Sequence, residues 1–472
     1  MRHKSVHLSI IFAICATFYF VALSVHLANN LPINIIEGLH AYLSHQFLLH
    51  QSIYPPAFKP PYTLNIYPPI YTIIGAIIST PFQYPSLIPL RVLSLLSEIG
   101  IALIITLLTY QRTKNLIVAS LLYALAIITW ATHGFHGLAR IDFFLCAILW
   151  LCCFSLTQYI DGHKRAIWWF GAFLTIALLT KQSAMTLWLS TLVYNFIPFP
   201  KKASIKIPIF TTLLGSLLFT LCISQLLQSV TGGEYLRHTS AYLFAFGFSQ
   251  STFWQTIKLV PFPYLILFVT ALLTIKVSET ITFLRIYLVI SLISFFVSIA
   301  KNGSDLNYTI EPISLLLFQC GYGIEWITKH AQMKKRYAVM LFCILAIPLH
   351  LYYGTYAENY GKASKKTQEE LLAQIIQTKG DILSEDPYYG MLLNKTVVTY
   401  DPYFFSHSME NSQLPVTDLV ENFKKGNIPV IITSTLYNNS PELQSVLNKK
   451  YHHIYKTSQS IPEGYWNIYI KN

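Results

Sequence analysis

The chain has 472 residues, of which 53% are hydrophobic and only 11% are charged, and its formal net charge is +12. Soluble globular domains carry about 25% charged residues, so this composition excludes an ordinary soluble protein. Nucleic-acid binding is not indicated either, because the positive charge is unevenly distributed. Residues 1–357 hold 22 Lys or Arg against 9 Asp or Glu, whereas residues 358–472 hold 11 against 12.

Apolar blocks about as long as the ~20 residues that cross a bilayer as a helix recur along residues 1–357. They predict a mainly α, polytopic bundle of about eleven transmembrane helices. The first block follows Met1-Arg2-His3-Lys4 with no obvious cleavage site, so we expect it to remain as the first span. The predicted spans are 8–28, 88–110, 116–133, 142–160, 166–180, 183–199, 207–228, 255–275, 281–300, 309–327 and 337–357.

Basic residues gather in alternate loops, which is the pattern that the positive-inside rule requires of the cytoplasmic side. The N-terminus is therefore predicted to be cytoplasmic, in a plasma or bacterial inner membrane. The outer side then receives the loops 29–87, 134–141, 229–254 and 301–308, together with the C-terminal region. The basic residues that define the inner side are Arg2, Lys4, Arg112, Lys114, Lys164, Arg165, Lys201, Lys202, Lys206, Lys276, Lys329, Lys334, Lys335 and Arg336.

The first outer loop, 29–87, is long and rich in Pro and Tyr. Glu37 opens an amphipathic stretch in it, and residues 68–80 are apolar but short and flanked by prolines. We interpret 68–80 as an interfacial or re-entrant helix, since a crossing here would move every later loop to the other side.

From residue 358 the composition turns polar, with helix-like segments at 364–378 and 416–425 and strand-like segments at 395–400, 428–434 and 464–470. These segments predict a small extracytoplasmic α/β domain over 358–472.

Acidic residues in the membrane region are costly, so each needs a reason. Five of the nine map to the outer face, where they could supply a general base, a metal site, or both. The alternative for the first of them, Glu37, is a helix-start acid that favours the helix dipole. The five are Glu37, Asp142, Glu234, Asp305 and Glu311.

The spacing of two pairs of charged residues predicts whether their side chains contact each other. Glu98 lies in mid-span, seven residues after Arg91 and on the same helix face, which predicts a structural polar pair. Arg140 and Asp142 are two residues apart, so on one helix turn they should not face each other.

Two cations, Lys181 and Lys301, fall on the side where the positive-inside rule disfavours them. A phosphate group is a natural partner for such lysines, and snorkelling to lipid headgroups is the alternative. His40, His133 and His136 lie near the same face and could ligate a metal, although the histidines form no HExxH motif and have no CxxC partner.

Four stretches occur in an order that resembles a known family. They are Glu37-Gly38 with Tyr67-Pro68-Pro69-Ile70-Tyr71, Ala139-Arg140-Ile141-Asp142, Thr180-Lys181-Gln182, and Gly303-Ser304-Asp305-Leu306-Asn307-Tyr308. Together with Ser384-Glu385-Asp386-Pro387 and Asp401-Pro402-Tyr403, they resemble the GT-C class of polyprenyl-phosphate-sugar-dependent glycosyltransferases. This class is related to protein mannosyltransferases and aminoarabinose transferases, and the chain is similar to its family 39.

The resemblance implies transfer of a sugar from a polyprenyl-phosphate donor to a lipid, glycan or protein acceptor on the outer face. It assigns catalysis to Glu37 and Asp142, as base or as ligands of Mg or Mn. Ile36 precedes Glu37 where many relatives have a second acid, so the need for a metal stays open. The residues expected to bind substrate are Arg140, Lys181, Gln182, Lys301, Asn307, Tyr308 and Tyr67.

Two other functions remain as alternatives. A multi-pass transporter or lipid flippase predicts charges near the midplane and symmetry between halves. A noncatalytic scaffold would leave Lys181 and the outer acids unexplained.

Overall fold

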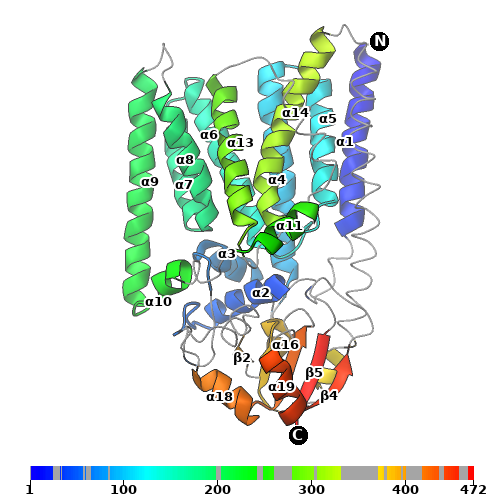
Figure 1. The fold of residues 1–472 in the computed structure, drawn as a ribbon. Coiled ribbons are helices and arrows are strands. Elements are labelled where there is room, and N and C mark those ends of the chain that lie inside the picture. The colour runs from blue at the N-terminus through cyan, green and yellow to red at the C-terminus, as the bar shows by residue number, and fades with distance from the viewer. Residues whose placement is uncertain are drawn as a thin grey trace.

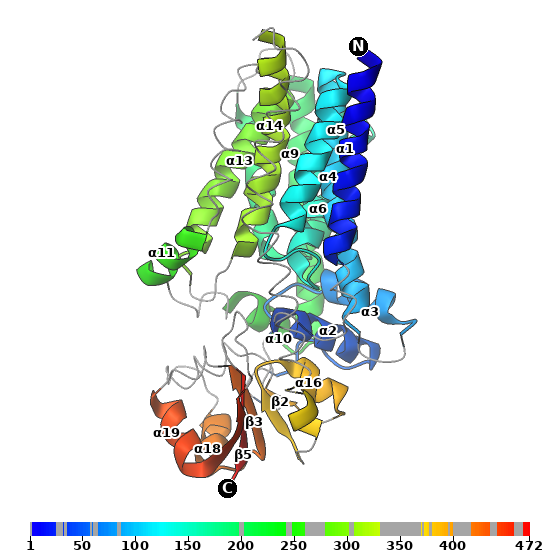
Figure 2. The same ribbon diagram turned by 90° about the vertical axis from the view of Figure 1, so that its right-hand side faces the viewer.

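The fold is that of a computed structural model, in which long helices stand side by side above a smaller C-terminal sheet (Figures 1 and 2). The residues that the structure describes are 2–24, 32, 35–56, 59, 65–82, 86–197, 203–241, 248–259, 279–301, 306–330, 370, 372–376, 380–394, 397–399, 417–434, 441–456 and 466–472.

The long helices form one bundle with a continuous apolar core. Figure 1 shows the N-terminus at the end of this bundle that lies away from the sheet. The helices are α1 (Arg2–Ser24), α4 (Ile88–Thr113), α5 (Leu116–Ala131), α6 (Ile141–Ile160), α7 (Ala166–Leu178), α8 (Met185–Phe196), α9 (Ala203–Val230), α13 (Glu279–Ser298) and α14 (Ile310–His330).

Four of the described helices are long and apolar enough to cross a membrane: α4, α6, Ile205–Val230 within α9, and Thr280–Ser298 within α13. Only 17% of the apolar window of α9 is buried, and its exposed side chains include Phe210, Leu218 and Phe219. A surface this apolar suits lipid better than water. Of the predicted spans, 337–357 and most of 255–275 lie outside the described residues, so the number eleven stays a prediction.

Arg112 and Asp161 form an ion pair that joins the end of α4 to the end of α6. α4 and α6 both begin at the opposite end of the bundle, which faces the sheet. Asn115 caps the next helix, α5, by accepting from the backbone N–H groups of Ile117 and Val118. The end of the bundle away from the sheet therefore carries Arg112 and Lys114, two of the predicted inner-side residues.

Two shorter helices lie between the bundle and the sheet, α2 (Ile35–Leu48) and α3 (Ile70–Ser79) (Figure 2). At 1.5 Å per residue, α3 is about 15 Å long and too short to cross ~30 Å of hydrocarbon. Residues 37–44 of α2 are buried on every side, whereas residues 45–48 are partly or fully exposed, and the amphipathic character of this stretch stays a prediction. One side contacts the bundle and the other contacts the C-terminal region, and a helix enclosed in this way needs no polar face.

The C-terminal region contains a five-stranded sheet in the order β2-β1-β3-β5-β4. The strands β1, β2 and β3 are parallel, whereas β5 is antiparallel to both β3 and β4. Strands β2, β3 and β5 fall within or next to the strand-like segments expected from the sequence, whereas β1 and β4 were not expected. The strands are β1 (Ile382–Ser384), β2 (Val397–Thr399), β3 (Val430–Ser434), β4 (Tyr451–Lys456) and β5 (Trp466–Lys471), with helices α16 (Pro387–Leu392), α18 (Thr417–Lys425) and α19 (Pro441–Lys450).

Short elements complete the end of the bundle that faces the sheet. They are the 3₁₀ turns η2 (Gln182–Ala184) and η5 (Leu306–Thr309), the short helices α10 (Glu234–Leu236) and α11 (Gln250–Leu259), and the π-helical turn η3 (Arg237–Ala241). Most of the residues expected to bind substrate lie on or beside these elements.

Candidate functional site

A buried ionic cluster centres on Asp142, in the first turn of α6. Its Oδ1 accepts hydrogen bonds from Lys181 Nζ at 2.6 Å and from Asn307 Nδ2 at 2.8 Å. Its Oδ2 accepts from Arg140 Nε at 3.1 Å. We call Arg140, Asp142, Lys181 and Asn307 the Asp142 cluster, which unites three loops that are far apart in the sequence.

The contact between Arg140 and Asp142 corrects the expectation that these side chains do not meet. The i, i+2 rule applies within a helix, but Arg140 precedes α6 with an extended backbone, at φ −125° and ψ 149°. Its guanidinium carbon also lies 4.1 Å from the ring centroid of Phe135. The extended residue therefore turns its charge back toward the helix start.

Two tyrosine rings flank the ammonium of Lys181. Its Nζ lies 5.1 Å from the ring centroid of Tyr308 and 5.6 Å from that of Tyr67, within the range of a cation–π contact. Burial alone would lower the pKa of Lys181, but the carboxylate of Asp142 outweighs it, and the pKa lies above its ordinary value. Lys181 therefore keeps its positive charge.

A pocket lined by both polar and apolar side chains opens beside the cluster. Asp142, Lys181, Asn307 and Tyr308 form its polar side. Glu311 adds a second carboxyl group, whose Oε1 accepts from Thr186 Oγ1 at 2.6 Å. The apolar side comes from α6 and α13, including Leu145, Leu149 and Phe295.

The cluster carries more positive than negative charge. Arg140 and Lys181 face the single carboxylate of Asp142. Lys301 is partly buried nearby, and burial together with the charge of Lys181 lowers the pKa of Lys301. Lysine and arginine side chains gathered in this way suit an anionic ligand such as a phosphate.

Gln182 holds the first loop against the segment that follows α9. Its Nε2 donates to the carbonyl oxygens of Ile66 at 2.7 Å and of Thr239 at 2.9 Å. Ile66 directly precedes Tyr67, so Gln182 holds the backbone beside the ring that faces Lys181.

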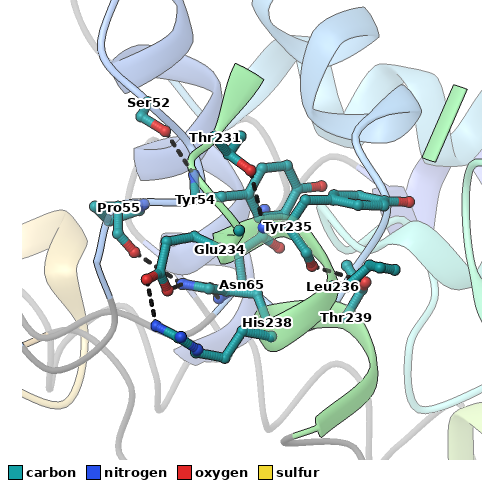
Figure 3. Close-up of polar contacts among 12 residues, drawn as sticks. Ser52, Tyr54, Pro55, Asn65, Thr231, Glu234, Tyr235, Leu236, His238 and Thr239 are labelled. Carbon is teal, nitrogen blue, oxygen red and sulfur yellow. Dashed lines mark hydrogen bonds and ion pairs between the residues drawn. The ribbon is translucent and has the colours of Figure 1, made fainter. Parts of the chain in front are cut away.

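His238 fastens the same two segments a second time (Figure 3). Its Nδ1 accepts the backbone N–H of Asn65 at 3.0 Å, which leaves Nε2 to donate to the carbonyl of Pro55 at 2.8 Å. Burial lowers the pKa of His238, in keeping with this neutral tautomer. Tyr54 and Tyr235 pack edge to face beside it, at 5.1 Å between centroids. These residues form a scaffold that supports the Asp142 cluster.

Glu37 is fully buried in α2, and both of its carboxylate oxygens are bonded. Oε1 accepts from Arg91 Nε at 2.8 Å and from the backbone N–H of Ala139 at 2.7 Å. Oε2 accepts from Arg91 Nη2 at 2.9 Å. This two-pronged ion pair ties α2 to α4 and to the loop before α6. The role of Glu37 as a general base stays a prediction.

The expected pair of Arg91 with Glu98 is wrong. Glu98 Oε2 lies 2.7 Å from His136 Nδ1, and Glu98 Oε1 accepts from the backbone N–H of Gly137 at 2.7 Å. Residues seven apart share a helix face but are about 10 Å apart along the axis. Each charge therefore pairs with a different segment.

His40, one turn further along α2, has neither ring nitrogen bonded within the described part of the chain. The ring is 1% exposed and lies between Tyr67, at 5.4 Å, and Tyr71, at 4.9 Å between centroids. Burial, together with the charge of Arg140, lowers the pKa of His40 to about 3, although Asp142 opposes the shift. The imidazole is thus neutral and buried beside the cluster.

No family model matches the sequence, and no curated protein matches it. Among solved structures, ArnT from Cupriavidus metallidurans bound to undecaprenyl phosphate is similar at a TM-score of 0.65 and 13% identity, over 98% of this chain and 97% of that one. The chain has the GT-C fold.

Two further structures share this GT-C fold. ArnT in the apo state aligns at a TM-score of 0.59 and 13% identity, over 99% of this chain and 98% of that one. The archaeal oligosaccharyltransferase AglB from Archaeoglobus fulgidus, in complex with an inhibitory peptide and a dolichol-phosphate, aligns at 0.50 and 11% identity, over 98% and 74%.

A divalent metal does not fit the two predicted ligands as the GT-C fold places them. Glu37 is bonded to Arg91, and Asp142 is bonded to Lys181 and Arg140, so a metal would have to displace a cation from each. Within the described ranges, no three His, Cys, Asp or Glu side chains form a metal-binding group. The metal requirement therefore enters no step below and stays a prediction.

The fold brings most of the predicted site residues together. The predicted residues that meet at the cluster are Arg140, Asp142, Lys181, Asn307, Tyr308 and Tyr67. Gln182 instead bonds backbone, Glu37 is tied to Arg91, and Asp305 lies outside the described residues. Glu311 was expected at the outer face but not in the pocket, although its position one turn after Asn307 is a usable signal.

Proposed function

We propose that this protein is a membrane glycosyltransferase that moves a sugar from a polyprenyl-phosphate donor to an acceptor at the outer face of the membrane. The observation that carries the proposal is the Asp142 cluster, a buried carboxylate bonded by Arg140 and Lys181 beside a partly apolar pocket. The polar side suits a sugar phosphate and the apolar side suits the first isoprene units of its lipid.

The fold gives a second line of support. ArnT was solved with undecaprenyl phosphate and AglB with a dolichol-phosphate, both of which are polyprenyl phosphates. The charge pattern of the loops favours placing the cluster on the extracytoplasmic side. The sugar and the acceptor, whether lipid, glycan or protein, are matters for experiment.

The cations of the cluster have a clear electrostatic task in this reaction. When the bond between the anomeric carbon and the phosphate breaks, the phosphate changes from a singly charged diester to a more negative monoester. Lys181, Arg140 and Lys301 stabilise the charge that develops on it. Asp142 orients Lys181 and Arg140, and the flanking rings of Tyr67 and Tyr308 confine the ammonium.

The test is to incubate the purified protein in nanodiscs with a panel of radiolabelled undecaprenyl-phosphate sugars and to follow sugar release or transfer. We expect turnover with at least one donor and its loss in Asp142→Asn, with Thr113→Ala at the far end of α4 as the control. A folded protein that turns over no donor but binds an unrelated solute would instead favour transport. Glu98 offers little to that alternative, because His136 and Gly137 hold its carboxylate.

A further inference from the structure

His40 is a buried polar side chain to which the described part of the chain offers no hydrogen bond. Its ring is 1% exposed, and within the described part of the chain neither nitrogen has a partner. Most buried polar groups in folded proteins are paired, since an unpaired one loses its bonds to water without replacement. A bound substrate could supply the hydrogen bond that this imidazole lacks.

The ring of Tyr67 connects His40 to the Asp142 cluster. It lies 5.4 Å from the imidazole centroid, and its own centroid is 5.6 Å from Lys181 Nζ. Tyr71 of α3 covers the imidazole at 4.9 Å. The charges of Arg140, Asp142 and Lys181 all shift the pKa of His40. A group held by Lys181 is thus one aromatic ring away from the imidazole.

The other candidate proton acceptor, Glu37, is already engaged. Its two oxygens accept from Arg91 and from the backbone of Ala139. Taking up a proton there would leave the buried guanidinium of Arg91 without its counter-charge, which is costly. His40 has no such bond to lose.

We infer that His40 accepts the proton of the acceptor group during glycosyl transfer at the Asp142 cluster, a role that rests on the proposed function. The proton of an acceptor hydroxyl or amine passes to a ring nitrogen of His40. The freed electron pair forms the new bond to the anomeric carbon. The bond from that carbon to the phosphate oxygen breaks, and its electrons leave with the polyprenyl phosphate. Because the ring of Tyr67 lies between His40 and Lys181, this step requires that ring to rotate while Gln182 holds the backbone at Ile66.

The charges around His40 give this role a characteristic pH dependence. Burial and the charge of Arg140, with a smaller effect of Lys181, lower the pKa of the imidazole to about 3, against the opposing effect of Asp142. A bound donor phosphate offsets the effect of both cations, so the pKa rises in the complex. Activity should fall as the pH falls, because a protonated imidazole accepts no proton. The fall in kcat, which reports the complex, should come at higher pH than the fall in kcat/KM, which reports the free enzyme.

The test compares His40→Gln with His45→Gln, the same change on the same helix at a partly exposed position. Both are assayed in nanodiscs with the undecaprenyl-phosphate sugar that the donor panel identifies. We expect His40→Gln to lower kcat by roughly 10²–10⁴-fold with little change in KM for the donor. The remaining activity should no longer fall as the pH is lowered. Imidazole should partly restore His40→Ala. If His40→Gln is active and its activity still falls at low pH, the role of His40 is overturned, whereas the proposed function is not.

A second measurement does not depend on turnover. Replacing an unpaired buried imidazole by an apolar side chain of similar volume should raise the unfolding midpoint, so His40→Leu should unfold at a higher temperature than the wild type. A lower midpoint would show that His40 has a structural partner and would overturn the inference. A wild-type protein that is inactive with every donor would overturn the proposed function, and this role with it.

Discussion

Lys181 is the residue on which the electrostatics of the site depend, because it contacts Asp142 and two aromatic rings at once. Replacing it with Met keeps the length of the side chain and removes the charge. We expect Lys181→Met to lower kcat about 10²–10³-fold, as when one stabilising donor is removed from a site where charge develops. The measurement is release of labelled sugar in nanodiscs.

Lys206→Met is the matched control, because Lys206 Nζ donates to the carbonyl of Ile197 near the far end of α9. Its activity should stay near that of the wild type. Equal losses in the two variants would mean that Lys181 acts only through stability.

Glu37 has two possible roles, as the ion-pair partner of Arg91 and as a general base. Measurements of stability and of activity separate them. Because Arg91 is 1% exposed, Glu37→Gln should leave a buried charge unpaired and cost about 3–5 kcal/mol in the free energy of unfolding. Denaturation in detergent measures this cost. Glu37→Gln with Arg91→Gln should recover part of it, as a double-mutant cycle would show. A Glu37→Gln protein that folds and keeps full transferase activity would contradict the predicted role of Glu37 as base.

At the scale of elements, α2 is the helix that packs both against the helix bundle and against the C-terminal region. Leu39 and Leu43 pack with Tyr235 on one side, and Ala41 packs with Leu90 and Tyr388 on another. Gly38 faces the carboxylate of Asp386, which caps α16 by accepting the N–H of Tyr388. A side chain at position 38 would collide with that carboxylate.

Gly38→Ala should therefore push Asp386 from its capping position and cost about 1 kcal/mol or more in the free energy of unfolding. Gly100→Ala is the control, since no atom lies within 4 Å of a Cβ at that position, and in a helix it should stabilise slightly. Thermal unfolding and limited proteolysis of the C-terminal region would measure the difference. Unchanged stability in Gly38→Ala would show that α16 does not pack tightly on α2.

The sequence predicts elements better than it predicts contacts in this protein. The apolar blocks place α4, α6 and α13 within a few residues, because hydrophobic length is a local property. The pairs of the site are not local. Glu37 meets Arg91 across 54 positions, and Asp142 meets Asn307 across 165. The family-like motifs nonetheless indicated most members of the cluster, while the unpaired state of His40 depends on packing that no spacing reveals.

At the scale of the whole molecule, the C-terminal sheet docks on the bundle next to the site. Tyr388 at the start of α16 is fully buried with Tyr71, Leu90 and Ala139. Tyr388→Ala should remove this packing and cost about 3–5 kcal/mol in the free energy of unfolding. Because Ala139 leads into Arg140, sugar release should fall as well.

Tyr388→Phe keeps the ring and should retain most of the stability and activity of the wild type. Thermal unfolding and the labelled-sugar assay compare the two variants. Full activity in a folded Tyr388→Ala protein would show that the sheet is not needed to shape the site.

The position of β5 between β3 and β4 has a consequence for biosynthesis. β5, Trp466–Lys471, follows all the other strands of the described sheet in the sequence, and β4 pairs with no other strand of that sheet. While the ribosome is still adding these residues, β4 has no neighbour and the sheet is incomplete. The helices can enter the membrane in order during synthesis, but the described sheet beside α2 closes only after β5 has left the exit tunnel. A nascent chain that stops before Trp466 would carry the Asp142 cluster without the finished sheet that packs against it.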